Sequence, residues 1–295
     1  MDSYRSAPTK LLINVIMGKF ITHMSINKKL SFDAFLATYP VFRLDELAQA
    51  RGQTAQLAPA RNQLKYHLRQ GRVKRMARMV YATVPFDRTP QTFEPDPVQV
   101  AAALRPDAIF SHHTALELLG AGHSLWKEHT FFCDDPGPVL ALGTHRLHFL
   151  AHPTALRRRR LIRLGLRQGE RQGRDVAFTG PERTLVDGFR QPRWVGGLEE
   201  LLNSAAGFGV LDLDLLQHVL AAYDHQLLWA AVGWFLERHQ AVFSVPDKYL
   251  ARLEEKRLPR PRYLERGERG GYLVPRWNLI VPRHLLRWEG QDDQP

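Results

Sequence analysis

The stretch of sequence that decides the fold of the N-terminal part is residues 57–83, LAPARNQLKYHLRQGRVKRMARMVYAT. Apolar residues recur there at helical spacing, at Leu57, Leu64 and Leu68. Pro59 fits only the first turn of such a helix, and Gly71 marks its end. Residues 72–83 then alternate in a way that favours two short strands joined near Ala77. The stretch therefore predicts one helix followed by a β-hairpin.

Two more helices are expected before this stretch. Ser31 is a good N-cap for a helix whose apolar face contains Phe32, Phe35, Leu36 and Tyr39, and Pro40 stops it. Residues 42–48 predict a second short helix, which ends near Gly52. Three helices followed by a hairpin are typical of a winged helix-turn-helix, which we assign to residues 28–84.

Positive charge is concentrated in this predicted domain. The whole chain of 295 residues has a formal net charge of +11. Residues 41–83 contain nine basic and two acidic residues, which leaves +7 in about a seventh of the chain. Such an asymmetry favours a polyanionic partner.

The helical spacing predicts which side chains meet that partner. If Leu57, Leu64 and Leu68 face the core, the basic side of the third helix faces solvent. We expect the third helix to read base edges and phosphates, and the hairpin to contact the backbone of double-stranded DNA. The predicted DNA-binding residues are Arg61, Asn62, Lys65, Tyr66, Arg69, Arg72, Lys74, Arg75 and Arg78. Tyr81 is expected in the core, and His67 is expected to be half-buried beside the apolar stripe.

Several classes of protein are disfavoured by the composition. Cys133 is the only cysteine, so an intrachain disulfide is impossible and a reducing compartment, the cytoplasm, is expected. The apolar stretch at residues 11–17 is shorter than the roughly 20 residues of a membrane span, and no signal-peptide cleavage pattern follows it. Met24 opens a more natural start, so residues 1–23 are interpreted as an upstream extension that is poorly ordered or dispensable. Because the first domain is assigned from residue 28, the whole N-terminal extension is taken as residues 1–27.

A second, larger domain is expected over residues 98–295, after a proline-rich linker at residues 85–97. Its pattern predicts a mixed α/β arrangement, so the fold class of the chain is α+β. Helices are expected at residues 100–104, 111–119, from Pro181 onward and over most of 198–239. Strands are expected at residues 130–133, 147–150, 176–178 and 277–281.

Several segments resemble the AbiEi-type antitoxins, transcriptional regulators of type IV toxin–antitoxin systems linked to abortive infection by phage. The resemblance covers about residues 30 to 240. In the first domain it rests on residues 35–42 (FLATYPVF), 64–68 (LKYHL), 71–75 (GRVKR) and 80–82 (VYA). In the second it rests on residues 109–120 (IFSHHTALELLG) and 181–187 (PERTLVD). The family usually has a glycine at the position of Met79, and this residue lies at the predicted turn of the wing, where glycine would favour a tight turn.

The resemblance implies both a function and partners. It implies that the winged helix represses its own operon by binding inverted repeats near the promoter. It also implies that the C-terminal domain counters a nucleotidyltransferase-like toxin, without the need for a stable complex. The sequence alone leaves open a winged-helix regulator without a toxin, a protein-binding winged helix, and a metal-dependent nuclease.

Patterns that resemble a catalytic or metal site have simpler structural explanations. His112 and His113 are adjacent on a helix and point about 100° apart, so they cannot easily share a metal. His145 and His148 face opposite sides of a strand, and with His152 they lack a fourth ligand. We therefore expect neither a metal nor a cofactor.

Carboxylates near Pro181 have structural interpretations too. Glu182 complements a helix N-terminus, and Asp187 is spaced for a helical ion pair with Arg183 that stabilises by a few tenths of a kcal/mol. No phosphate-binding glycine loop or nucleophile elbow is present. We expect no enzymatic activity and no catalytic residues.

A second basic run lies in the larger domain at Arg157, Arg158, Arg159 and Arg160. A solvated helix face is the simpler interpretation. A supplementary contact to nucleic acid, or a face for an acidic partner, is the alternative.

Overall fold

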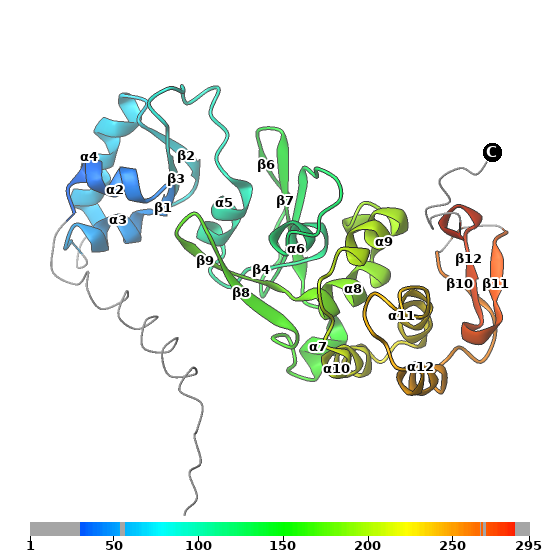
Figure 1. The fold of residues 1–295 in the computed structure, drawn as a ribbon. Helices are drawn as coiled ribbons and strands as arrows, with labels where there is room; N and C mark the ends of the chain where they lie inside the picture. Colours follow the sequence, from blue (N-terminus) through cyan, green and yellow to red (C-terminus); the bar gives the residue numbers. More distant parts are fainter. Residues whose placement is uncertain (1–29, 54–56, 266, 268–269, 287–295) are drawn as a thin grey trace, which may run out of the picture. The chain divides into compact units, whose positions relative to one another are not determined.

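The fold was analysed in a computed structural model, which describes residues 30–53, 57–265, 267 and 270–286. The predicted extension over residues 1–27 lies outside the described residues. The chain forms two compact units, residues 1–93 and 94–295 (Figure 1). Both helices and strands are abundant, so the fold class is mixed α and β. Among the described residues, no helix is both long and apolar enough to cross a membrane.

The described residues of the first unit form three helices and a three-stranded sheet. Its elements are α2 (Phe32–Thr38), β1 (Val41–Arg43), α3 (Leu44–Ala50), α4 (Leu57–Arg69), β2 (Val73–Ala77) and β3 (Val80–Thr83). The strands are antiparallel, with β3 between β1 and β2. Ser31 caps α2 as predicted, because its side chain accepts a hydrogen bond from the backbone N–H of Ala34 at 3.1 Å.

The second helix was predicted to begin too early. Val41–Arg43 form β1 instead, in which Phe42 lies opposite Tyr81 of β3. Arg43 is then the N-cap of α3, and its backbone N–H donates to Glu46 Oε2 at 2.8 Å. Pairing with a distant strand therefore overrides the local helical pattern at these residues.

The turn between β2 and β3 is tight although it lacks glycine. Met79, between β2 and β3, adopts a positive φ of 67°, and its carbonyl accepts a hydrogen bond from Leu44 N at 2.9 Å. Met79 also packs against the core of the first unit. This core is formed mainly by fully buried side chains: Phe35, Phe42, Leu44, Leu47 and Leu64.

The second unit is built on a six-stranded mixed sheet, counted over the described residues. Its order is β6-β7-β5-β4-β9-β8 (Figure 1). The strands are β4 (Ile109–Phe110), β5 (Glu128–Cys133), β6 (Leu140–Leu142), β7 (His145–Ala151), β8 (Leu166–Arg171) and β9 (Arg174–Thr179). The pairs β5–β7 and β4–β9 are parallel, and the other pairs are antiparallel. The strands predicted at 130–133, 147–150 and 176–178 lie within β5, β7 and β9.

Helices form most of the core of this unit. They are α5 (Pro97–Leu104), α6 (His112–Leu118), α7 (Thr154–Arg158), α8 (Pro181–Arg190), α9 (Leu198–Ala206), α10 (Leu213–Tyr223), α11 (Gln226–Arg238) and α12 (Asp247–Glu254). Short 3-10 turns occur at Pro192–Trp194, Pro275–Trp277 and Arg283–Leu286. The largest buried cluster contains side chains from α8 to α12.

A small separate sheet follows α12. Its strands are β10 (Arg262–Tyr263), β11 (Tyr272–Val274) and β12 (Leu279–Val281), with β12 in the middle. The final strand was predicted to include Trp277, but this residue belongs to the 3-10 turn Pro275–Trp277 and is fully buried. It fits tightly against α11, since a Cβ on Gly233 would lie 2.3 Å from Trp277 Cζ3. Close packing rather than strand pairing therefore fixes Trp277.

Candidate nucleic-acid interface

Helix α4 separates an apolar side from a basic side. Ala60 and Leu64 are fully buried, and Leu57 and Leu68 pack against the same core with part of their surface exposed. The helix therefore turns the predicted apolar stripe inward. The residues on its other side are exposed, so far as the described part of the first unit shows.

Every predicted DNA-binding residue of α4 lies on that other side. The five exposed residues are Arg61, Asn62, Lys65, Tyr66 and Arg69. Tyr66 exposes 59% of its surface, which is unusual for an aromatic residue that packs in a core. The side chains of Arg61, Lys65 and Arg69 form no hydrogen bond or ion pair with any other described residue. These cations are therefore available to an external anion.

The cations of the hairpin and its approach differ in availability. Arg78, at the turn between β2 and β3, is exposed and has no polar partner among the described side chains. Arg75 is exposed and donates from Nε to the carbonyl of Ala77 at 3.3 Å. Lys74 is only half-exposed, and its Nζ donates to the carbonyl of Phe93 at 2.7 Å. Lys74 is thus less available to a ligand than Arg75 or Arg78.

Arg72 is also engaged within the first unit. Its Nη2 pairs with Asp33 Oδ1 at 2.5 Å, and its Nη1 lies 3.2 Å from His67 Nδ1. The Arg72 hydrogen bond and charge lower the pKa of the Asp33 carboxyl below its usual value. Both partners remain exposed to solvent, so the pair can exchange with an external anion. The sequence offers one local signal for Asp33, its place as an acid in the first turn of α2, and this does not predict the pairing with Arg72.

His67 and Tyr81 lie where the sequence predicted. His67 is half-buried and stacks on Phe32 with ring centroids 3.8 Å apart. Burial, and then the charge of Arg72, lower the pKa of His67. Tyr81 is 8% exposed and packs in the core near Phe42. Neither residue belongs to the exposed basic side.

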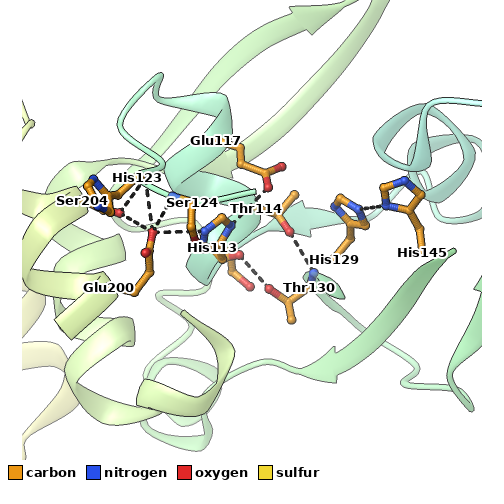
Figure 2. Close-up of polar contacts among 11 residues, drawn as sticks. His113, Thr114, Glu117, His123, Ser124, His129, Thr130, His145, Glu200 and Ser204 are labelled. Atoms are coloured by element: carbon orange, nitrogen blue, oxygen red, sulfur yellow. Dashed lines mark hydrogen bonds and ion pairs between the residues drawn. The ribbon is translucent and has the colours of Figure 1, made fainter. Parts of the chain in front are cut away.

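The second unit holds a cluster of polar contacts around His113 and Glu200 (Figure 2). His113 is fully buried, with Nδ1 at 3.2 Å from Glu117 Oε1 and Nε2 at 3.4 Å from Glu200 Oε1. Glu200 Oε1 also accepts hydrogen bonds from the backbone N–H groups of His123 and Ser124 and from the hydroxyl of Ser204. Although burial opposes it, hydrogen bonds from Ser204 and Ser124 lower the pKa of Glu200. This carboxylate ties the loop after α6 to α9.

The three histidines of the sequence pattern around β7 have separate partners. His145 Nδ1 lies 2.8 Å from His129 Nε2, and His148 Nε2 lies 2.5 Å from Glu128 Oε2. His152 Nε2 lies 3.4 Å from Asp134 Oδ1. Over the described residues, no group of three or more His, Cys, Asp or Glu side chains is arranged to hold a metal ion.

The carboxylates of α8 belong to a buried network. Arg183 Nε lies 3.4 Å from Asp187 Oδ2, and both side chains are fully buried. Arg183 Nη1 donates to the carbonyls of Ile162 and Leu164, and the hydroxyl of Tyr223 donates to Asp187 Oδ1 at 2.5 Å. The predicted helical ion pair is present, and it is buried rather than exposed, so removing one partner would leave an uncompensated buried charge.

Glu182 has a structural contact as well. It is 2% exposed, and its Oε1 accepts a hydrogen bond from the backbone N–H of Asp212 at 2.9 Å, at the start of α10. Its carboxylate thereby links α8 to α10. This contact crosses between two helices, which the sequence pattern did not reveal.

The second basic run lies at the end of α7. Arg157, Arg158, Arg159 and Arg160 are all exposed. Arg159 pairs with Asp224 at 2.9 Å and donates to the carbonyl of Ala221. The side chains of the other three have no hydrogen bond or ion pair within the described part of the chain. The run is therefore a second exposed cationic surface, on the second unit.

Comparison with known proteins gives a likeness in fold. No protein-family model and no curated protein matches the sequence. Among solved structures, the Rv2827c protein from Mycobacterium tuberculosis is similar, with a TM-score of 0.54 at 15% sequence identity. The match covers 84% of this chain and 89% of that chain. At this level of identity the likeness concerns the arrangement of the backbone, and it extends over most of both chains.

Proposed function

We propose that the chain is a DNA-binding transcriptional autorepressor and the antitoxin of a type IV toxin–antitoxin system. Its first unit acts as a winged helix-turn-helix, with α4 as the recognition helix and β2–β3 as the wing. The observation that carries the DNA-binding part is the free basic side of α4. Three cations there have no intramolecular partner among the described residues, and Asn62 and Tyr66 lie beside them.

The chemistry of this side fits duplex DNA. Arginine and asparagine side chains form bidentate hydrogen bonds with guanine and adenine in the major groove, and lysine and tyrosine contact phosphates. An α-helix fits the width of that groove. Arg78 and the exposed Arg75, whose Nε bonds only to the nearby carbonyl of Ala77, can contact the flanking DNA backbone. If four or five cations neutralise phosphates, log K should fall with log salt with a slope of about −4 per protomer.

The antitoxin role is proposed on the resemblance of residues 109–120 and 181–187 to the AbiEi-type family. Its partners would be the repeats of its own promoter and a nucleotidyltransferase-like toxin, in the cytoplasm. A winged-helix regulator without a toxin is the nearest alternative. A metal-dependent nuclease is less supported, because Glu182 and Asp187 are engaged in buried structural contacts.

The decisive experiment is a titration of the full chain with duplex DNA from its own promoter across a salt series. Arg61→Ala with Lys65→Ala should abolish the shift, while toxin neutralisation in cells is retained. Arg146→Ala is the matched control, since this exposed arginine lies on β7 in the second unit. Loss of neutralisation together with DNA binding would contradict the division of roles. A wild-type chain that fails to shift its promoter at low salt would overturn the DNA-binding proposal.

The arginine run at residues 157–160, at the end of α7, remains a second candidate contact. Replacing Arg157, Arg158 and Arg160 by glutamine in the full chain tests them in the same titration. A shallower salt slope would assign them to the DNA contact, whereas an unchanged slope would leave them as a solvated face.

A further inference from the structure

The turn of the β2–β3 hairpin consists of two residues, Arg78 and Met79. Ala77 of β2 lies opposite Val80 of β3, so these two residues close the hairpin. Met79 has a positive φ of 67°, and its side chain is partly buried against the core of the first unit. Ala77 has only a methyl group, and Val80 is fully buried. Of the four residues 77–80, Arg78 is therefore the one with a long exposed side chain.

The turn is held at a fixed place relative to α4, within the first unit (Figure 1). The Met79 carbonyl accepts a hydrogen bond from the backbone N–H of Leu44, the first residue of α3, at 2.9 Å. Leu44, Leu64 of α4 and Val73 of β2 are buried in the same core. A duplex whose major groove holds α4 therefore meets the Arg78 side chain at one defined position along its axis.

The two exposed arginines of the hairpin differ in their freedom. Arg75 lies within β2, and its Nε donates to the carbonyl of Ala77 at 3.3 Å, which keeps this side chain along the strand. The side chain of Arg78 has no hydrogen bond or ion pair within the described residues. Its guanidinium group can therefore extend beyond the hairpin without breaking an existing contact.

A single extended arginine at a narrow turn fits the minor groove of DNA. This groove is about 6 Å wide in B-DNA, so it accepts one side chain more easily than a helix or a β-ribbon. Runs of A·T pairs narrow it further and strengthen its negative potential, which attracts arginine. A guanidinium group is also more weakly hydrated than an ammonium group, so it loses less solvation on entering.

We propose that Arg78 is a specificity-determining residue, which enters the minor groove beside the site contacted by α4 and selects flanks rich in A·T pairs. This inference rests on the proposed DNA-binding function and adds a sequence preference outside the bases that α4 contacts. Arg75, which is held along β2, contacts phosphates and adds affinity without a preference. The test must therefore separate groove contact from phosphate contact at Arg78.

The test uses the full chain and three versions of the promoter duplex. They differ only in about five base pairs on each side of a repeat, half a helical turn, which are A·T, G·C or inosine·cytosine pairs. Inosine lacks the 2-amino group of guanine, so an inosine·cytosine pair combines the minor-groove edge of A·T with the major-groove edge of G·C. In fluorescence anisotropy titrations at one salt concentration, we expect the A·T and inosine·cytosine versions to bind alike. Both should bind about 5- to 10-fold more tightly than the G·C version.

Variants assign the preference to Arg78. Arg78→Ala should bind all three duplexes with the same affinity. Arg78→Lys keeps the charge, so it should recover affinity for all three but only part of the preference, because an ammonium group is more strongly hydrated. Arg75→Ala is the matched control, since this exposed arginine lies in the same hairpin but away from the turn. It should weaken the three duplexes by the same factor and leave the preference intact.

Three results would overturn the inference and leave the DNA-binding function in place. One is equal binding of the wild type to all three duplexes. Another is a preference for A·T over both other versions, which would place the contact in the major groove. The third is an undiminished preference in Arg78→Ala. A wild-type chain that binds none of the three at low salt would instead contradict the DNA-binding function itself.

Discussion

Arg72 and Asp33 form an ion pair at 2.5 Å between the segment that enters β2 and the first turn of α2. The pair places an acid beside one of the cations proposed to bind DNA. Its side chains are 45% and 76% exposed, so neither is locked in place. A phosphate that approaches Arg72 must compete with the Asp33 carboxylate. Arg72 is therefore less available to DNA than the unpaired cations of α4.

Replacing Asp33 should strengthen duplex binding. In Asp33→Asn the Arg72 guanidinium is free for a phosphate, so affinity at low salt should rise by about 3- to 10-fold and the salt slope should steepen by about 0.9. Promoter titrations over a salt series measure both quantities. Asp45→Asn is the matched control, since Asp45 pairs with Arg43, which is outside the proposed contact. Equal effects in the two variants would mean that only net charge matters and that Arg72 does not touch DNA.

Two lysines of the first unit should differ in their effect on duplex binding. Lys65 is exposed on α4, whereas Lys74 Nζ is bonded to the carbonyl of Phe93. We expect Lys65→Ala to weaken binding several-fold and to reduce the salt slope by about 1, and Lys74→Ala to leave the slope unchanged. Titrations of both variants with promoter duplex over the same salt series provide the comparison. A reduced slope in Lys74→Ala would show that this lysine leaves Phe93 to contact a phosphate.

The buried pair of α8 predicts a large effect on stability. Asp187→Ala leaves the Arg183 charge without its carboxylate partner in a fully buried position, so the free energy of unfolding should fall by about 3–5 kcal/mol. Urea unfolding of the full chain, followed by tryptophan fluorescence, measures the change. Arg146→Ala breaks an exposed pair with Glu128 and should cost less than about 1 kcal/mol. Similar losses in both variants would contradict the burial argument.

Local signals in the sequence predicted much of the fold and of the proposed interface. Ser31, Pro40 and Gly71 delimit helices through their own backbone chemistry, so the bounds of α2 and α4 could be predicted. The outward side of α4 followed from the spacing of Leu57, Leu64 and Leu68. These features depend on neighbours within a few residues.

Features that depend on distant partners could not be predicted. β1 is a strand only because it pairs with β3. β8 contains two arginines, so its sequence does not indicate that it pairs with β9. The i,i+4 spacing of Arg183 and Asp187 predicted their contact but not their burial, which α10 completes through Tyr223. Likewise, no local pattern linked Asp33 to Arg72 or Lys74 to Phe93.

Two buried histidines predict how stability depends on pH. Burial lowers the pKa of His112 to about 4, and burial likewise lowers the pKa of His129 to about 4. In the unfolded chain a histidine has a pKa of about 6.5, so between about pH 6.5 and 4 the unfolded state binds protons that the folded state does not. The stabilisation is therefore complete above about pH 6.5 and is lost progressively on acidification to about pH 4. Each histidine contributes a slope of up to about 1.4 kcal/mol per pH unit.

The variant His129→Gln tests this pH dependence of the free energy of unfolding. Urea unfolding at about pH 5 and about pH 7 gives the free energy of unfolding at both values, and the difference between them should shrink in the variant. His218→Gln is the matched control, because it removes an exposed histidine of α10 rather than a buried one. The absolute stability of His129→Gln also reflects the lost contact with His145, at 2.8 Å, so the comparison rests on the pH difference alone. An undiminished difference in His129→Gln would mean that His129 binds a proton equally in the folded and unfolded chain.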